Sequence, residues 1–351
     1  MPTRNVLFTV ENTDPEVPWL TNYLETLLVQ TWYPTTVATN SWACKQVIIN
    51  YMEKTADTLH GVPFMLHDFG YRGVSSVESA GIGGAAHLVN FPMTDTLAGI
   101  LVAKESYGAV FPRMSGPGGG ANEHSTITSW GRDGETEAIK SFLERVKGMV
   151  VVVVDSYDIW NFLENVIGGE LKSLVEERGF FGVRPDSGDP TIILVKVLDI
   201  LGEKFGYSIN SKGFKLLPKF LKVIQGDGIS YDTLGPIMES VAKAGWSVEN
   251  LTFGSGGALL QRVDRDTQRC AFKCSMAVVD GEDRDVYKDP ITDPGKKSKR
   301  GRLALVKDRQ GWSTVTEQQM MDREDQLVTV FENGDLVKEW QWEEVKAKAN
   351  L

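Results

Sequence analysis

The sequence predicts an α/β fold, a (β/α) barrel with a smaller β-rich C-terminal subdomain. From about residue 60 onward, short apolar runs alternate with helical stretches, which is typical of βα units in a parallel sheet. Polar and glycine-rich turns follow these runs, at the position where α/β barrels carry their functional loops. The chain has 351 residues, more than one hydrophobic core usually serves, so we expect one large and one smaller domain.

The first expected element is a helix after Asp14 and Pro15. Apolar residues recur at helical spacing between residues 19 and 32, and this periodicity is the main signal for an amphipathic helix. We expect Asp14 to cap the helix and Pro15 to lie in its first turn. This N-terminal helical segment, residues 1–58, would lead into a barrel at residues 59–270.

Four βα units are readable in the barrel segment, with strands expected at residues 150–154, 181–183, 221–224 and 251–253. The valines at 150–154 indicate a strand covered on both faces, as parallel sheets require. Polar or glycine residues follow each strand: Asp155, then Arg184 and Asp186, then Gly226 and Asp227, then Gly254 to Gly257. Because the carboxyl ends of parallel strands meet at one mouth of a barrel, we expect these residues to converge there.

The remaining segment, residues 271–351, is expected to form the β-rich subdomain. Strands are predicted at 271–279, 302–307 and 326–331, and the last is followed by a hairpin turn at 332–334 and a strand at 336–340. A basic loop at 288–302 lies among them.

The composition excludes several classes of protein. A formal net charge of −10 argues against a protein that coats nucleic acid or anionic membrane. The three cysteines form no even disulfide set and no CxxC pair, which favours a reducing, cytoplasmic setting and argues against structural zinc. We find no secretory leader pattern and no apolar run of membrane-spanning length.

Three common motifs are absent or lie in the wrong context. Gly81 to Ala86 resembles GxGxxA, but it sits within a helical stretch with no strand before it, so a dinucleotide-binding fold is not expected. The sequence contains no P-loop GxxxxGK[ST] and no GxSxG elbow.

Five segments together resemble one family. In chain order they are Asp68 to Gly73, Glu123 to Thr126, Arg184 to Gly188, Gln225 to Gly228 and Phe253 to Gly257. The chain resembles the nicotinamide phosphoribosyltransferase family from about Asn5 to the C-terminus. The resemblance implies an irregular barrel of the type II phosphoribosyltransferase kind. It also implies transfer of a phosphoribosyl group from 5-phosphoribosyl 1-pyrophosphate to nicotinamide, which yields nicotinamide mononucleotide and pyrophosphate in NAD salvage.

Phe69, Arg72 and Asp95 are the candidates for base recognition. An aromatic ring beside a guanidinium can hold a heteroaromatic ring and a phosphate, although the residues alone favour a core Phe and a surface Arg. Asp95 could be the cap or first-turn acid of a helix that runs through Leu101. The resemblance implies that Phe69 stacks on nicotinamide, that Arg72 contacts the base and phosphate region, and that Asp95 accepts a hydrogen bond from the carboxamide and repels nicotinate.

His124 lies in a polar loop after the glycine-rich run 116–120. On the sequence alone it could be a solvated loop histidine. The resemblance implies that ATP phosphorylates it and so stimulates the reaction. We expect His124, Asp155 and Asp186 to be the catalytic residues.

Carboxylates and cations after the strands are candidates for the phosphate and metal sites. Asp155, Asp186 and Asp227 could hold Mg²⁺ together, directly or through water, although each alone could be a turn residue. Arg184, Arg265, Gly226 and the backbone N–H groups of Gly256 and Gly257 are expected to contact phosphate. The resemblance implies that Lys273 and Lys296 also reach the phosphates, the second from a partner subunit. Ala271 stands where the family has a hydroxyl, a loss of about 1 kcal/mol.

The resemblance carries two further expectations. A homodimer is expected, because the family shares its active sites between subunits. Full-length members have an N-terminal region before the position of Met1, which donates a second stacking residue, so a shortened form is expected to expose apolar surface. The alternative function is a weakly active or inactive homologue that binds ligands or partners. A nicotinate phosphoribosyltransferase is disfavoured because of Asp95.

Overall fold

The computed structural model describes residues 2–111 and 120–349, so most of the glycine-rich run lies outside the described residues. The chain divides into two compact units. The barrel unit comprises Pro34–Val263 and Gln341–Leu351, and the β-rich unit comprises Met1–Tyr33 and Asp264–Trp340. This division differs from the segments expected at 1–58, 59–270 and 271–351. The first residues belong with the β-rich unit because they pair with it: the Val6 N–H donates to Thr314 Oγ1 at 2.8 Å.

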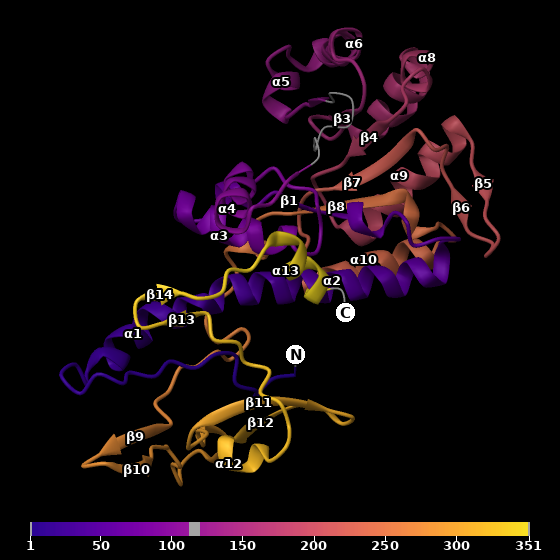
Figure 1. Ribbon diagram of the computed structural model, residues 1–351. Helices are drawn as coiled ribbons and strands as arrows, with labels where there is room; N and C mark the ends of the chain where they lie inside the picture. Colours follow the sequence, from indigo (N-terminus) through magenta and orange to yellow (C-terminus); the bar gives the residue numbers. More distant parts are fainter. Residues whose placement is uncertain (1, 112–119, 350–351) are drawn as a thin grey trace. The chain divides into compact units, whose positions relative to one another are not determined.

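The barrel unit is built around a parallel sheet (Figure 1), which has six strands among the described residues, in the order β1-β8-β7-β4-β3-β2. Its strands are β1 (Leu66–Asp68), β2 (Gly120–Ala121), β3 (Val150–Val153), β4 (Phe181–Arg184), β7 (Leu221–Gln225) and β8 (Leu251–Ser255). All five pairings are parallel. Within this sheet, the first strand in chain order pairs with the last, as in a barrel.

The barrel continues past the free edge of β1. Asp68 forms a parallel bridge with Thr94, so the segment after Phe91 lies along that edge as a partial further strand. No pairing between this segment and β2 occurs among the described residues. The sheet is therefore an incomplete, irregular barrel, and this confirms the predicted fold class.

Helices follow the strands as the βα pattern predicted. The helices of the barrel unit are α2 (Trp32–Thr55, from Pro34 onward), α3 (Val77–Leu88), α4 (Leu97–Tyr107), α5 (His124–Thr128), α6 (Glu135–Arg145), α7 (Ile159–Asn161), the π-helix η5 (Phe162–Glu170), α8 (Lys172–Glu176), α9 (Pro190–Phe205), α10 (Tyr231–Lys243), α11 (Gly257–Leu260) and α13 (Trp342–Ala349). Short 3₁₀ turns are η2 (Val62–Phe64), η3 (Tyr71–Gly73), η4 (Arg132–Gly134) and η6 (Val248–Asn250), and a small hairpin joins β5 (Ser208–Ile209) to β6 (Lys215–Leu216).

The long helix α2 runs beside α10 (Figure 1). The Tyr51 hydroxyl donates to Glu239 Oε2 at 3.0 Å, and a Cβ added at Gly235 would lie 3.9 Å from the Val47 side chain. The contact covers α10 on the side away from the sheet.

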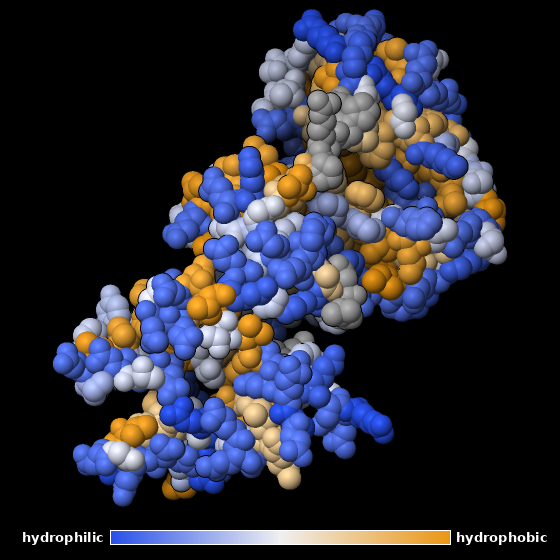
Figure 2. Space-filling model, in the orientation of Figure 1, coloured by the Kyte–Doolittle hydropathy of each residue, from blue (hydrophilic) through white to orange (hydrophobic). Residues whose placement is uncertain are grey.

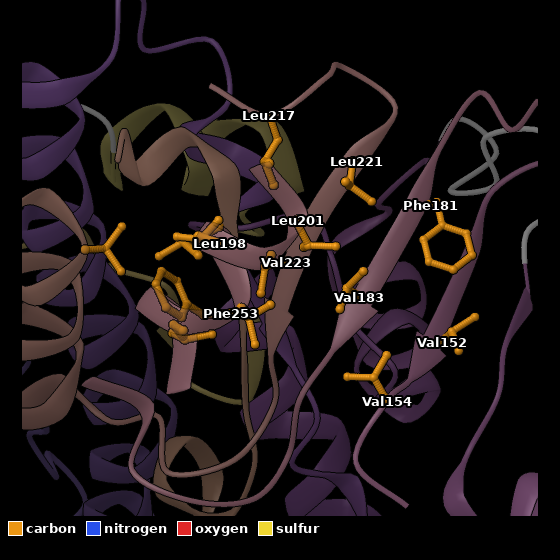
Figure 3. Packing of buried hydrophobic residues seen from close by; sticks show 14 of the residues in the cluster. Val152, Val154, Phe181, Val183, Leu198, Leu201, Leu217, Leu221, Val223 and Phe253 are labelled. Carbon is orange, nitrogen blue, oxygen red and sulfur yellow. The ribbon is translucent and has the colours of Figure 1, made fainter. Parts of the chain in front are cut away.

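The core lies between the strands and the helices that follow them. Figure 3 shows Leu201 of α9 near Val183 and Val223, and Leu198 of α9 near Phe253, and all five are fully buried. Burying such a side chain is worth about 1.5–3 kcal/mol. This packing gives a rigid frame that fixes the carboxyl ends of the strands.

Glycines explain the close packing of α3 on α4. A Cβ added at Gly99 would lie 2.6 Å from the Gly84 carbonyl carbon and 2.8 Å from Ala85 N, so the two helix backbones touch. The GxGxxA-like run lies within α3. This confirms that it is helical and serves helix packing.

The β-rich unit contains antiparallel pairs. They are β9 (Met276–Val279) with β10 (Glu282–Asp285), β11 (Leu303–Asp308) with β12 (Gly311–Thr316), and β13 (Phe331–Glu332) with β14 (Asp335–Leu336). Its helical elements are α1 (Leu20–Leu28), η1 (Val29–Thr31), η7 (Pro294–Lys296) and α12 (Glu317–Met320). The predicted hairpin turn is confirmed: Asn333 and Gly334 have φ of 51° and 98°, which a two-residue hairpin turn of this type requires.

The predicted start of the N-terminal helix is wrong. Helix α1 begins at Leu20, and its N-cap residue, Trp19, makes no side-chain cap hydrogen bond. Asp14 Oδ1 instead accepts from the Glu16 N–H at 2.9 Å, which closes a local turn. Such a turn competes with helix capping for the same carboxylate.

The three thiols are free, and burial raises the pKa of Cys44 to about 12, so this thiol is a core group.

On the face shown in Figure 2, apolar residues are scattered among hydrophilic ones. None of the helices in the described part of the chain combines the length and apolarity needed to cross a membrane.

Candidate active site

The candidate site lies at the carboxyl ends of the barrel strands. Phe69 follows β1, Asp155 follows β3, Asp186 follows β4, Gly226 follows β7, and Gly256 follows β8. Because all these strands are parallel, the residues share one edge of the sheet. The predicted convergence of the strand-end residues is therefore found.

The aromatic ring of Phe69 is held between backbone and guanidinium. The Phe69 N–H donates to Ser255 O at 2.9 Å, which extends the pairing of β1 with β8. A Cβ on Gly254 would overlap the Phe69 ring, so the ring occupies space that only glycine leaves open. The Arg184 guanidinium carbon lies 5.3 Å from the ring centroid, within range of a cation–π contact.

Arg184 is oriented by Asp186. Its Nε donates to Asp186 Oδ1 at 3.3 Å and its Nη2 donates to Oδ2 at 3.2 Å, a bidentate pair. A Cβ on Gly226 would lie 3.0 Å from both Arg184 Nε and Asp186 Oδ1. The turn after β7 therefore packs directly on this pair, and the cation stands beside the aromatic ring with a fixed orientation.

His124, the first residue of α5, forms a hydrogen bond with Asp155. Its Nε2 lies 2.9 Å from Asp155 Oδ1. The Asp155 side chain is 3% exposed and the His124 side chain 40% exposed. The other oxygen, Oδ2, accepts from the Asp186 N–H at 3.0 Å. One buried carboxylate thus connects the histidine to the loop after β4.

The charge of Asp155 determines which ring nitrogen of His124 carries the hydrogen. Burial by itself would raise the pKa of the Asp155 carboxyl, but hydrogen bonds from Ser187, His124 and the Asp186 backbone outweigh it and lower the pKa below the ordinary value. An ionised carboxylate only accepts hydrogen bonds, so Nε2 carries the hydrogen. Nδ1 is then the ring nitrogen that can act as a nucleophile when the imidazole is neutral.

Asp95 lies in the loop before α4. The N-cap of α4 is Thr96, and no side-chain cap hydrogen bond is made there, so the capping role is not observed. Neighbouring protein atoms partly desolvate the Asp95 carboxyl and so raise its pKa, Arg184 opposes this shift, and Asp68 adds to it. Asp95 is exposed to solvent and acts electrostatically on the same guanidinium that faces Phe69.

The three carboxylates predicted to hold Mg²⁺ are not all connected to one another. Asp155 and Asp186 are linked through a hydrogen bond, whereas Asp227 is exposed. No group of three or more His, Cys, Asp or Glu side chains in the described ranges is arranged to hold a metal ion. In proteins, Mg²⁺ is commonly held by one or two carboxylates together with substrate phosphates, and these carboxylates fit that arrangement. They do not surround an ion with protein ligands alone.

The glycine turn after β8 opens a helix, as predicted. Gly256 is the N-cap of α11, which begins at Gly257 and is only 4 residues long. A Cβ on Gly73 would lie 3.2 Å from Gly257 Cα. The loop that carries Phe69 and Arg72 therefore packs against this turn, and Arg72 itself is exposed.

Three predicted phosphate ligands, Arg265, Lys273 and Lys296, belong to the β-rich unit. Arg265 pairs with Asp266 at 3.0 Å, Lys273 with Glu25 at 3.8 Å and Lys296 with Asp293 at 3.3 Å. All three are exposed. Their roles as phosphate ligands stay predictions.

Three residues have roles at the site that the sequence did not indicate. Gly254 makes room for the Phe69 ring, His67 packs edge-on against that ring with centroids 6.0 Å apart, and Ser187 hydrogen-bonds Asp155. A glycine inside a strand is a known signal for close approach of another group, so Gly254 could have been found. His67 and Ser187 carry no such signal.

This barrel, with an aromatic ring, an arginine and carboxylates at the ends of its parallel strands, is consistent with a phosphoribosyltransferase. The sequence profile of the nicotinate phosphoribosyltransferase (NAPRTase) family matches residues 64–335. The chain belongs to this family.

Relatives with established names agree with this assignment. A nicotinamide phosphoribosyltransferase from Xanthomonas campestris pv. campestris is 48% identical over 100% of this chain and 76% of its own length. Proteins of the same name from Mycoplasma pneumoniae and Acinetobacter baylyi are 34% and 32% identical and cover 86% and 97% of this chain, and 68% and 72% of their own lengths. Among solved structures, a nicotinate phosphoribosyltransferase from Porphyromonas gingivalis aligns with 66% of this chain and 51% of that chain, with 17% identity and a TM-score of 0.42.

Proposed function

We propose that this protein transfers the 5-phosphoribosyl group of 5-phosphoribosyl 1-pyrophosphate to nicotinamide and releases nicotinamide mononucleotide and pyrophosphate, a step of NAD salvage. One observation carries the proposal: the Phe69 ring, placed against Gly254, stands beside the Arg184 guanidinium, and Arg184 interacts with Asp95. A flat, uncharged base with a carboxamide suits this combination. The ring can stack on Phe69, and the amide N–H can donate to Asp95.

The chemistry requires no side-chain nucleophile. The ring nitrogen of nicotinamide forms a bond to C1 of the ribose while the bond from C1 to the pyrophosphate oxygen breaks, and the electron pair of that bond leaves with pyrophosphate. The protein positions the base and stabilises the negative charge that develops on the leaving group. Arg184, held in place by Asp186, supplies a cation at the edge of the site.

Mg²⁺ is part of the proposal. Asp186 and Asp227, after neighbouring strands, would hold it together with the substrate phosphates, and Asp155 is engaged with His124 and the Asp186 backbone. When bound, the ion neutralises charge on the pyrophosphate.

His124 is the proposed site of phosphorylation by ATP. The hydrogen bond from Nε2 to Asp155 orients the ring and favours the tautomer in which Nδ1 has a lone pair. The 40% exposure of the His124 side chain gives a nucleotide access to it. A phosphate on Nδ1 would lie on the side of the ring away from Asp155. It would add negative charge near the strand ends and so would act on the region proposed for pyrophosphate.

The alternative of an inactive, binding-only homologue is not favoured. An inactive homologue would be expected to have lost the residues that act on the substrates. Here Phe69, Arg184 and the His124–Asp155 pair form an organised set. A homodimer, and a cytoplasmic setting in which the three free cysteines stay reduced, complete the proposal.

Exchange of Asp95 for Ser tests the proposed substrate. Removing the carboxylate removes both the acceptor for the carboxamide and the repulsion of nicotinate, so kcat/KM for nicotinamide should fall by about 10-fold to 100-fold while use of nicotinate stays or rises. The control is Asp133→Ser, which removes an exposed carboxylate in η4 and should change neither rate. An equal loss of both activities in Asp95→Ser would remove the argument for nicotinamide.

A further inference from the structure

The backbone of Asp68 joins the two loops that flank the base site. Its N–H donates to Met93 O at 3.2 Å, and its carbonyl accepts from the Asp95 N–H at 2.9 Å. Asp68 immediately precedes Phe69 in the chain. The stacking ring and the carboxylate proposed to recognise the carboxamide therefore belong to residues that both adjoin Asp68, one through the peptide bond and the other through a hydrogen bond.

The side chain of Asp68 repeats this connection. Its Oδ1 accepts from the Gly70 N–H at 2.7 Å, which fixes the loop after Phe69. Its Oδ2 accepts from the Thr94 hydroxyl at 3.4 Å, and Thr94 Oγ1 in turn accepts from the Thr96 N–H at 2.9 Å. A chain of hydrogen bonds thus runs from the Phe69 loop through one carboxylate to the start of α4.

Burying the Asp68 carboxylate costs free energy, and packing alone does not require a carboxylate at this position. Asp68 is 0% exposed, and burial raises the pKa of its carboxyl although the Gly70 N–H opposes the shift. A buried carboxylate destabilises a fold unless it is well hydrogen-bonded. The loop is also shaped to admit it, because a Cβ on Gly70 would lie 3.0 Å from Asp68 Oδ1 and 2.8 Å from Leu260 Cγ.

We propose that Asp68 is a positioning residue for base recognition, whose carboxylate holds the Phe69 loop and the Asp95 loop at a fixed separation. The proposal rests on the proposed function, since it assigns a role in binding the same base. It concerns only the base, because the His124–Asp155 and Arg184–Asp186 pairs are built without Asp68. Loss of the carboxylate should therefore weaken binding of nicotinamide more than binding of the sugar pyrophosphate.

The test compares the KM values of both substrates in Asp68→Ala and Asp68→Asn. Without the carboxylate the two loops are joined only by the backbone hydrogen bonds of Asp68, so the KM for nicotinamide should rise on the order of 10-fold in Asp68→Ala, with a smaller change in the KM for 5-phosphoribosyl 1-pyrophosphate. Asparagine keeps an oxygen for the Gly70 N–H, and its amide can donate to the second lone pair of the Thr94 hydroxyl. Asp68→Asn should therefore restore most of the nicotinamide affinity.

The matched control is Asn250→Ala. Asn250 is 2% exposed, accepts from the Leu217 N–H at 2.9 Å and donates to the Ser247 carbonyl at 2.7 Å, but lies before β8, away from the site. Its loss should lower the denaturation midpoint as Asp68→Ala does and leave both KM values unchanged. If both variants raise the nicotinamide KM equally, Asp68 has only a structural role.

Two further outcomes are decisive. If Asp68→Ala does not fold, Thr94→Val cuts the same connection at its other end and should raise the nicotinamide KM selectively; an unchanged KM there would overturn the inference. If the unaltered protein makes no nicotinamide mononucleotide, the proposed function fails, and isothermal titration of nicotinamide into the unaltered protein and Asp68→Ala still decides the positioning role. Equal nicotinamide affinities in these two folded proteins would contradict it.

Discussion

Replacing Gly254 with alanine tests whether the Phe69 ring must occupy its observed place. A Cβ at residue 254 would lie 2.7 Å from Phe69 Cζ and closer still to two other ring carbons. Non-bonded carbon atoms need about 3.5 Å, so the ring must move by roughly 1 Å or more. That shift would change the contact of Phe69 with the Arg184 guanidinium.

The expected magnitude follows from the size of the shift. A misplacement of about 1 Å in a positioned group can cost on the order of 100-fold in rate, and loss of an aromatic contact costs about 0.5–1.5 kcal/mol. We expect kcat/KM for nicotinamide to fall between about 10-fold and 100-fold in Gly254→Ala. The KM for 5-phosphoribosyl 1-pyrophosphate should change much less, because the three atoms nearest to the added Cβ all belong to the Phe69 ring.

The assay is steady-state kinetics with each substrate varied in turn, together with urea unfolding. Overpacking a core usually costs about 1–3 kcal/mol, so a control with the same kind of overlap is needed. Gly182→Ala provides it, since its Cβ would lie 2.8 Å from Ile224 Cδ1 and 3.0 Å from Val151 Cγ2 without touching Phe69. If folded Gly254→Ala binds nicotinamide as the unaltered protein does, the reasoning about the ring is refuted.

Two other predictions follow from the His124–Asp155 pair. His124→Ala should abolish stimulation by ATP and keep basal transfer, whereas His60→Ala, an exposed histidine elsewhere, should keep both; stimulation that persists in His124→Ala would exclude the phosphorylation role. Because the folded-state pKa of Asp155 is lowered, its contribution to stability is present above the unfolded pKa of about 3.9 and is lost as the pH falls through the folded pKa. Urea unfolding should therefore show Asp155→Asn less stable than the unaltered protein at pH 7, with the difference shrinking below about pH 4; a constant difference would contradict this assignment of the charge.

Much of the barrel was predictable because its strands are buried on both faces. The runs at 150–154, 181–183, 221–224 and 251–253 correspond to β3, β4, β7 and β8 within two residues at each end. Continuous apolar runs followed by polar turns leave few other interpretations. The same pattern placed Asp155 and Asp186 at one end of the sheet, where they are found.

The closure of the site was not predictable from local patterns. Strand β1 has only 3 residues, and its partner at Thr94 is a single bridge, so neither has enough length to show a period. The hydrogen bonds of Asp68 depend on this pairing, which brings together residues 26 positions apart. Asp68 therefore appeared only as part of a motif, and its role emerged from the contacts.

The boundary between the units also escaped the sequence analysis. The helical segment that follows Asp14 was expected to lead directly into the barrel, but residues 1–33 belong with 264–340. Pairing such as that of Asn5 Oδ1 with the Thr314 hydroxyl, at 3.1 Å and 309 positions apart, depends on tertiary structure. No local propensity reports a contact of that range.

The most direct test of the account is product analysis in a competition between two bases. The protein is incubated with equal concentrations of nicotinamide and nicotinate, with 5-phosphoribosyl 1-pyrophosphate and Mg²⁺, and the products are identified by mass spectrometry. The account predicts nicotinamide mononucleotide as the main product. Nicotinate mononucleotide as the main product, or no mononucleotide from folded protein that binds the sugar pyrophosphate, would contradict it.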